Sequence, residues 1–163
     1  MTAQRLSDIL ARIEAAKKEG VKVVCGGEKE ARADLRKGNF MQPTILTNVK
    51  PDMAVARNEL FGPVLCVFAY DELDDAIRTA NDSEYGLAGY VWSNDIRESH
   101  RIAQELEVGI VFLNAYEYQS EIPFGGYKAS GMGREHGTEA IHEYTQLKSV
   151  TVGMERFKSR FEV

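Results

Sequence analysis

The chain has 163 residues, of which 44% are hydrophobic and 28% are charged, so it can build a packed core and is not expected to be disordered. No stretch approaches the roughly 20 consecutive apolar residues of a transmembrane helix. The net charge of -5 opposes binding to phosphate backbones. We therefore expect a folded protein with no membrane span and no nucleic-acid partner.

The two cysteines and the first residues predict a cytoplasmic protein. Cys25 and Cys66 lie far apart, and neither belongs to a Cys-x-x-Cys pair that would indicate a zinc site or a disulfide framework. Residues 1–20 include Asp8, Glu14 and Glu19, and they lack the apolar core of a signal peptide. We expect reduced thiols and an N-terminal segment that is part of the fold.

The first half of the chain predicts one helix and two extended segments. Apolar residues recur at helical spacing near the start of the chain, and Gly20 is expected to end this helix. The apolar residues are Leu6, Ile9, Leu10, Ile13 and Ala16. A β-branched run at residues 21–25 predicts a strand. Residues 40–49 are expected to be extended around Pro43.

From residue 64 onward, strands and helices are predicted to alternate. Apolar runs predict strands at residues 64–68, 88–92 and 109–113. Helical periodicity predicts one helix near residues 73–80 and another near 96–106, the second capped by Ser93 or Asn94. This order predicts an α/β fold with a mostly parallel sheet and flanking helices on both faces. Ligands of such sheets bind beyond the carboxyl ends of the strands, which indicates residues 114–134.

Residues 114–134 form a long connection rich in aromatic residues and glycine. Long ordered loops are often functional, but this one could also be a surface loop that covers an apolar edge. Gly131 and Gly133 do not have the spacing of a dinucleotide fingerprint, so we expect them to serve the backbone. His100 has no partner in sequence, and we expect it at the surface.

A cluster of acidic and histidine residues follows that loop: Glu135, His136, Glu139, His142 and Glu143. Its spacing is not that of a His-Glu-x-x-His zinc motif. Solvated charges on a helix explain the cluster more simply, so we predict no metal site.

Glu59 and Phe61 stand directly before a turn and a buried strand. A carboxylate can hold the two hydroxyls of a ribose, and an adjacent ring can pack on a planar heterocycle. The simpler alternative is an exposed glutamate beside a phenylalanine that anchors the start of the strand.

Several motifs occur together in the order found in one enzyme family. They are Glu59-Leu60-Phe61-Gly62-Pro63-Val64, Tyr85-Gly86-Leu87, Pro123-Phe124-Gly125-Gly126-Tyr127-Lys128 and Ser130-Gly131-Met132-Gly133-Arg134-Glu135. From about Gln4 to about Val152, the chain resembles the NAD(P)-dependent aldehyde dehydrogenase superfamily. The resemblance implies the fold of that family's catalytic domain, with a C-terminal β-arm.

The resemblance also implies roles for individual residues. Glu59 corresponds to the glutamate that grips the nicotinamide ribose, and Phe61 to the aromatic residue at the nicotinamide end of NAD or NADP. Leu87 corresponds to an apolar residue beside the nicotinamide. The residues that correspond to the lining of the substrate tunnel are Glu117, Tyr118 and Phe124.

The catalytic groups of the family are missing from this sequence. The family reaction uses a cysteine nucleophile, a general-base glutamate and an asparagine that holds the oxyanion, and all three lie upstream of the matched region. Cys66 lies within an apolar strand, so burial should raise its pKa, and neither cysteine has a histidine or basic cluster nearby in sequence. We expect no catalytic residue here and no activity from this chain alone.

The end of the chain is predicted to mediate association. Residues 145–152, from Thr145 to Val152, alternate as a β-strand does, and the corresponding family segment pairs with a neighbouring subunit. We therefore assign residues 1–143 to the C-terminal part of the catalytic domain and residues 144–163 to an oligomerisation strand and tail. A homo-oligomer is expected.

Two hypotheses follow from these observations. In the first, the chain is the C-terminal portion of an aldehyde dehydrogenase, which oxidises an aldehyde to a carboxylic acid with hydride transfer to the nicotinamide. In the second, it is a free-standing, non-catalytic module that associates with homologous or N-terminal partner chains. Glu117 between Tyr116 and Tyr118 would suit a cationic or an aromatic aldehyde, or Glu117 points to solvent. The choice between NAD and NADP stays open.

Overall fold

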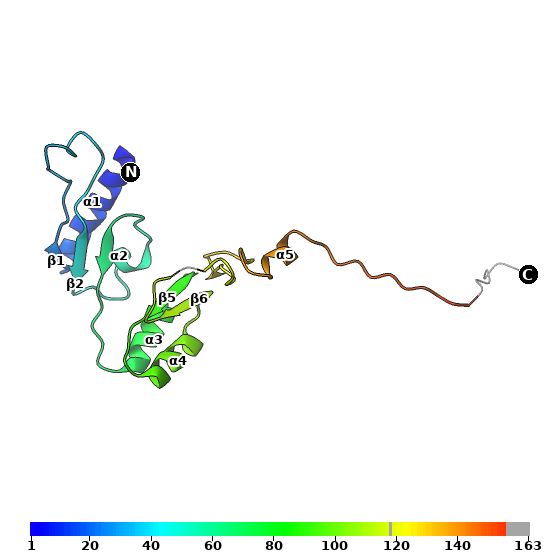
Figure 1. The fold of residues 1–163 in the computed structure, drawn as a ribbon. Coiled ribbons are helices and arrows are strands. Elements are labelled where there is room, and N and C mark those ends of the chain that lie inside the picture. The colour runs from blue at the N-terminus through cyan, green and yellow to red at the C-terminus, as the bar shows by residue number, and fades with distance from the viewer. Residues whose placement is uncertain (118, 156–163) are drawn as a thin grey trace, which may run out of the picture. The chain divides into compact units, whose positions relative to one another are not determined.

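A computed structural model describes residues 1–117 and 119–155 of the chain (Figure 1). The chain divides into two compact units, Met1–Ser83 and Glu84–Val163. Each unit contains its own small sheets and helices, and each is described by itself below.

Helix α1 (Ala3–Lys18) opens the first unit, as the periodicity predicts. Its N-cap is Thr2, whose hydroxyl accepts a hydrogen bond from the Arg5 amide at 3.2 Å. After the helix, Gly20 adopts a φ of 95°, a conformation that glycine reaches without strain. The buried face of the helix consists of Leu6, Ile9, Ile13 and Ala16.

A three-stranded sheet lies beside α1 and consists of β1 (Lys22–Cys25), β2 (Thr44–Thr47) and β3 (Val64–Cys66) in that order. Strands β1 and β2 are antiparallel, whereas β2 and β3 are parallel. Leu46 is fully buried in the cluster that includes the apolar face of α1. Leu65 is paired with Ile45 on the opposite face and is 58% exposed. Only one face of this sheet is therefore covered.

Two helices follow strands β2 and β3 of the first unit. Helix α2 (Ala54–Arg57) was not expected from the sequence, and it buries Val55. Helix α3 (Leu73–Asn81) was expected, and its buried residue is Ile77. Asp82 follows α3 as its C-cap, with its amide donating to the Arg78 carbonyl.

The second unit contains two separate pairs of strands. Strands β4 (Tyr85–Gly86) and β7 (Tyr127–Lys128) are antiparallel, and β5 (Ala88–Val91) and β6 (Ile110–Leu113) are parallel. Helix α4 (Ile96–Glu105) packs against β5 and β6. Helix α5 (Ala140–Glu143) lies within the cluster of acidic and histidine residues that the sequence places on a helix.

The cap of α4 differs from the prediction. Ser93 and Asn94 were the expected caps, but the Asp95 carboxylate accepts hydrogen bonds from the amides of Arg97 and Glu98, at 2.8 and 3.2 Å. A carboxylate also interacts favourably with the positive end of the helix dipole. Ser93 takes a supporting role, since its hydroxyl accepts a hydrogen bond from the Asp95 amide at 3.1 Å.

Two parts of the predicted fold are not seen in the described residues. The expected mostly parallel sheet is replaced by three small sheets, in which two strand pairs are parallel and two are antiparallel. The expected arm at residues 145–152 forms no strand, and Leu147 within it is 100% exposed. A strand needs a partner for its backbone hydrogen bonds, and this segment has none in the described structure.

Within the described ranges 1–117 and 119–155, no helix has the length and apolar character needed to cross a membrane. The same residues contain no group of three or more His, Cys, Asp or Glu side chains placed to hold a metal ion.

Candidate functional site

Glu59 and Phe61 line one pocket in the first unit. The pocket has a volume of about 290 Å³. It lies between the end of α2 and the start of β3, and its wall is formed by Val55, Asn58, Glu59, Leu60, Phe61, Gly62, Val64 and Cys66. The structure therefore brings together the two residues that the sequence motif predicts for the ribose and the nicotinamide.

Local backbone contacts explain how these side chains are presented. The backbone and side-chain N–H groups of Asn58 both donate to the Ala54 carbonyl, at 3.1 and 2.9 Å, and they end helix α2. Leu60 is buried and anchors the next turn in the core. Glu59 and Phe61 flank that anchor and are both exposed.

Phe61 adopts an unusual backbone conformation, with a φ of 54°. A side chain with a Cβ pays roughly 1–2 kcal/mol to enter the left-handed region, and such strain is concentrated at functional sites. Phe61 gains no core packing in return, because the residue remains 73% exposed. An exposed ring held by a strained turn is suited to stacking on a planar ligand.

The segment after Phe61 is fixed against the rest of the first unit. A Cβ added to Gly62 would lie 2.6 Å from Cδ1 of Ile9, so the backbone passes close to α1. The Pro63 carbonyl accepts a hydrogen bond from the Thr44 amide at 2.9 Å. The turn that carries Phe61 is therefore attached to both α1 and β2.

Glu59 carries a carboxylate that is available to a ligand. The residue is exposed, and no hydrogen bond or ion pair of its side chain is found within the described part of the chain. A free carboxylate can accept hydrogen bonds from two neighbouring hydroxyl groups. Together with the Phe61 ring, it fits a ribose joined to a flat heterocycle.

Cys66 lines the same pocket but lacks the features of a nucleophile. Its thiol is directed at the Val55 carbonyl at 3.7 Å, and burial raises the pKa of the thiol, as the sequence predicts. A raised pKa reduces the thiolate fraction and hence the reactivity. Cys25 is exposed at the end of β1, with its thiol 3.8 Å from the Pro43 carbonyl.

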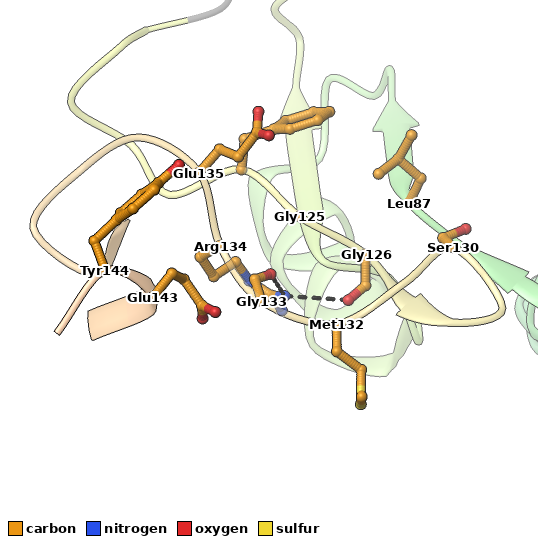
Figure 2. Close-up of a pocket in the computed structure, with 11 residues that line it drawn as sticks. Leu87, Gly125, Gly126, Ser130, Met132, Gly133, Arg134, Glu135, Glu143 and Tyr144 are labelled. Carbon is orange, nitrogen blue, oxygen red and sulfur yellow. Dashed lines mark hydrogen bonds between the residues drawn. The ribbon is translucent and has the colours of Figure 1, made fainter. Parts of the chain in front are cut away.

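Leu87 and Phe124 line a second pocket, in the second unit (Figure 2). This pocket has a volume of about 370 Å³. Its wall is formed by Leu87, Phe124, Gly125, Gly126, Ser130, Met132, Gly133, Arg134, Glu135, Glu143 and Tyr144. The structure thus brings one predicted cofactor residue next to one predicted tunnel residue.

Leu87 lies where the chain changes its pairing partner. Gly86 before it pairs with Tyr127 in β7, whereas the Leu87 carbonyl accepts a hydrogen bond from the Ile110 amide at the start of β6, at 3.3 Å. The junction between β4 and β5 leaves Leu87 42% exposed at the pocket.

The loop that carries Phe124 is closed on itself by hydrogen bonds. Phe124 and Glu135 exchange two backbone hydrogen bonds, each of 2.7 Å. The Arg134 guanidinium donates to the carbonyls of Gly126 and Gly133, at 3.1 and 2.7 Å, and lies 5.5 Å from the centre of the Tyr127 ring (Figure 2). We did not single out Arg134 as a site residue from the sequence, although its position in a glycine-rich loop was a signal.

Glu117, another predicted tunnel residue, is not among the residues that line either pocket. Glu117 is exposed, and Tyr118 lies outside the described residues. Their neighbour Tyr116 is 78% exposed, yet its ring stacks on Tyr90 with the centroids 5.3 Å apart. Phe112 stacks on the same Tyr90 ring, at 4.9 Å.

The start of this loop is held firmly. Asn114 has a φ of 50°, and its side chain exchanges two hydrogen bonds with the Ser93 backbone, at 3.0 and 2.7 Å. The Asn114 amide donates to the Val91 carbonyl at 2.9 Å. These contacts join the carboxyl ends of β5 and β6 at the point where the loop leaves the sheet.

Comparison with known families agrees with the motifs found in the sequence. The model of the aldehyde dehydrogenase family matches residues 1–150 of the chain. The chain belongs to the aldehyde dehydrogenase family.

Solved structures of aldehyde dehydrogenases are similar to this chain in fold and sequence. An aldehyde dehydrogenase from Bacillus cereus in complex with NAD+ is 41% identical over 94% of this chain, with a TM-score of 0.87. One from Mycobacterium tuberculosis complexed with NAD+ is 40% identical over 96% of this chain, with a TM-score of 0.88. A betaine aldehyde dehydrogenase from Staphylococcus aureus is 37% identical over 99% of it, with a TM-score of 0.92.

The match covers only part of each relative. This chain spans 31% of the Bacillus cereus protein and 32% of each of the other two. It therefore corresponds to about a third of an aldehyde dehydrogenase of that length.

Proposed function

We propose that the chain is the C-terminal portion of an NAD(P)-dependent aldehyde dehydrogenase and supplies its nicotinamide-ribose clamp. The observation that carries this proposal is the pairing, in one pocket, of the unpartnered Glu59 carboxylate with the exposed Phe61 ring. The reaction of the complete enzyme is the oxidation of an aldehyde to a carboxylic acid.

In this proposal, each clamp residue has a defined contact. Glu59 accepts hydrogen bonds from the two hydroxyl groups of the nicotinamide ribose, and the Phe61 ring packs on the nicotinamide end of the cofactor. Leu87 offers an apolar surface beside it. NAD or NADP supplies the hydride acceptor of the reaction, and the relatives from Bacillus cereus and Mycobacterium tuberculosis whose structures contain NAD+ support NAD.

The same proposal assigns part of the substrate tunnel to the loop after β6. Phe124 is half-buried at the second pocket and forms an apolar wall. Glu117 and Tyr118 are proposed to line the tunnel farther along the loop, where a carboxylate beside tyrosines suits a cationic aldehyde. The likeness to a betaine aldehyde dehydrogenase supports that substrate class.

A polypeptide limited to these 163 residues is not expected to oxidise aldehydes. The raised pKa of the Cys66 thiol disfavours a thiolate nucleophile at this position. We propose that the rest of the catalytic machinery is contributed by the part of the enzyme to which this chain does not correspond. In the alternative, the chain is a free-standing module that binds a partner carrying that machinery.

We also propose that residues 145–152 become a strand when they meet a neighbouring subunit. The segment is exposed along its whole length, and its backbone has no strand partner within the described residues. Pairing with the sheet of another subunit would satisfy those backbone groups and produce a homo-oligomer.

The clamp is tested by the variant Glu59→Gln in the complete enzyme that contains this chain. Loss of the charge should weaken NAD+ binding about tenfold, since hydrogen bonds to a charged group contribute about 1.5–3 kcal/mol. Isothermal titration calorimetry gives the Kd. The matched control is Glu28→Gln, the same change at an exposed glutamate of the first unit that lines neither pocket. Equal affinities for the two variants would reject the clamp.

A further inference from the structure

Arg57 at the end of α2 forms a two-point contact with Asp82 at the end of α3. Nη1 of Arg57 donates to the Asp82 carbonyl oxygen at 2.5 Å, and Nη2 donates to Oδ2 of Asp82 at 2.6 Å. Both side chains are largely accessible to solvent, at 41% and 59% exposure. Exposed ion pairs contribute little to stability, so this contact calls for another explanation.

The position of Arg57 close in sequence to Glu59, the proposed ribose-binding residue, suggests an explanation for this contact. Arg57 precedes Glu59 by two residues, and Asn58 between them is extended, with φ -103° and ψ 131°. Two residues span at most about 7 Å of chain. An arginine side chain that is not held elsewhere can bridge that length to the Glu59 carboxylate, and a guanidinium attracts a carboxylate.

Arg57 is instead held by Asp82, and Glu59 is left without a partner in the described chain. The hydrogen bond and the charge of Asp82 raise the pKa of Arg57. A guanidinium is protonated at every working pH even without that contact, so Arg57 is a cation that can compete for Glu59. Asp52 contributes a smaller electrostatic effect in the same direction.

We propose that Asp82 is a positioning residue that acts through Arg57, by keeping this guanidinium away from Glu59 and the carboxylate free for the ribose. This inference rests on the proposed clamp. It assigns a role in cofactor affinity to a residue that belongs to neither pocket.

The proposal makes an asymmetric prediction about two changes that break the same ion pair. Asp82→Ala removes the carboxylate and leaves Arg57 with only the backbone carbonyl of residue 82, so that the guanidinium can compete with the ribose for Glu59. Arg57→Gln removes the competitor and leaves Glu59 free. A purely structural brace between α2 and α3 would instead be weakened equally by both substitutions.

The experiment measures the Kd for NAD+ by isothermal titration calorimetry, in the complete enzyme that contains this chain. Asp82→Ala should raise the Kd about two- to fivefold, the size expected for one exposed ion pair. Arg57→Gln should leave it unchanged, and adding Arg57→Gln to Asp82→Ala should restore the original affinity. The control Asp75→Ala breaks a different exposed ion pair, with Arg78 on the same helix, and should have no effect.

Every outcome decides the question. An unchanged Kd in Asp82→Ala, equal losses in Asp82→Ala and Arg57→Gln, or a double variant that stays weak would each overturn the proposal. Should Asp82→Ala fail to fold, Asp82→Asn keeps an oxygen acceptor without the charge and should show a smaller increase in Kd that Arg57→Gln also reverses. Glu59→Gln distinguishes the two proposals. If Glu59 does not bind the ribose, this variant keeps the original affinity for NAD+. If only the role of Asp82 is wrong, Glu59→Gln still binds NAD+ more weakly than the original enzyme.

Discussion

Gly109, directly before β6, lies where two backbone segments of the second unit pass close to each other. A Cβ added at this position would lie 1.7 Å from the Gly125 carbonyl oxygen and 2.7 Å from its carbon. Ordinary contact begins at 3.4 Å, so the two segments would have to separate by about 1.7 Å. Both neighbouring atoms belong to the backbone, and no change of side-chain rotamer can relieve the overlap.

Hydrogen bonds hold both sides of this contact in place. The Gly109 amide donates to the Gly86 carbonyl at 3.1 Å, and the loop that carries Gly125 is closed by the pair of hydrogen bonds between Phe124 and Glu135. Gly109→Ala should therefore lower the free energy of unfolding by about 3 kcal/mol, at the upper end of the range for overpacked sites. For a chain of this size, that corresponds to a fall in Tm of roughly 6–12 °C.

Thermal unfolding followed by circular dichroism measures this effect. The matched control is Gly153→Ala, because a Cβ at Gly153 would have no atom within 4 Å. A Tm of Gly109→Ala within about 1 °C of that control would refute the close approach of the two segments.

Two further predictions concern the first pocket. Phe61→Gly should be more stable than Phe61→Ala by about 0.5–1 kcal/mol in urea unfolding, because glycine adopts the observed φ of 54° without strain; the reverse order would contradict a left-handed turn. In a Cys25→Ser background, alkylation of Cys66 by iodoacetamide should reach its half-maximal rate at a higher pH in the native chain than in urea. Burial raises the pKa of the native thiol, so less thiolate is present at a given pH; equal midpoints would show that the thiol is not desolvated.

Hydrophobic periodicity was sufficient to locate the longer elements. The 16-residue helix α1 and the strand–helix–strand run from β5 to β6 each contain enough repeats for the pattern to be read from one sequence. Helix α2, with four residues, and β4 and β7, with two residues each, are too short to show any period.

Strand pairing could not be obtained in the same way. The direction of β1 relative to β2 depends on the path of the charged loop between them. This loop folds back on itself, since Lys29 near its start forms an antiparallel β-bridge with Met41 near its end. The apolar strands predict a sheet covered on both faces, yet Leu65 in β3 and Trp92 after β5 are more than half exposed. Periodicity reports which residues are apolar and not what covers them.

The part of the candidate site that lies within a short sequence motif could be predicted. Glu59 and Phe61 were identified from six consecutive residues, and they share one pocket. The positive φ of Phe61 and the pairing of Arg57 with Asp82 were not predicted. The first depends on a strained turn, and the second joins residues 25 positions apart, so neither has a local sequence signal.

The two hydrogen bonds between Asn114 and Ser93 make the pairing of β5 and β6 independent of the loop sequence that follows. Strands β5 and β6 are tied together before the loop begins, so substitutions at Ala115 and Glu117 should leave the strand register unchanged. Such substitutions should therefore carry little penalty in folding. Asn114 itself cannot be substituted in this way, because its side chain forms both hydrogen bonds with Ser93.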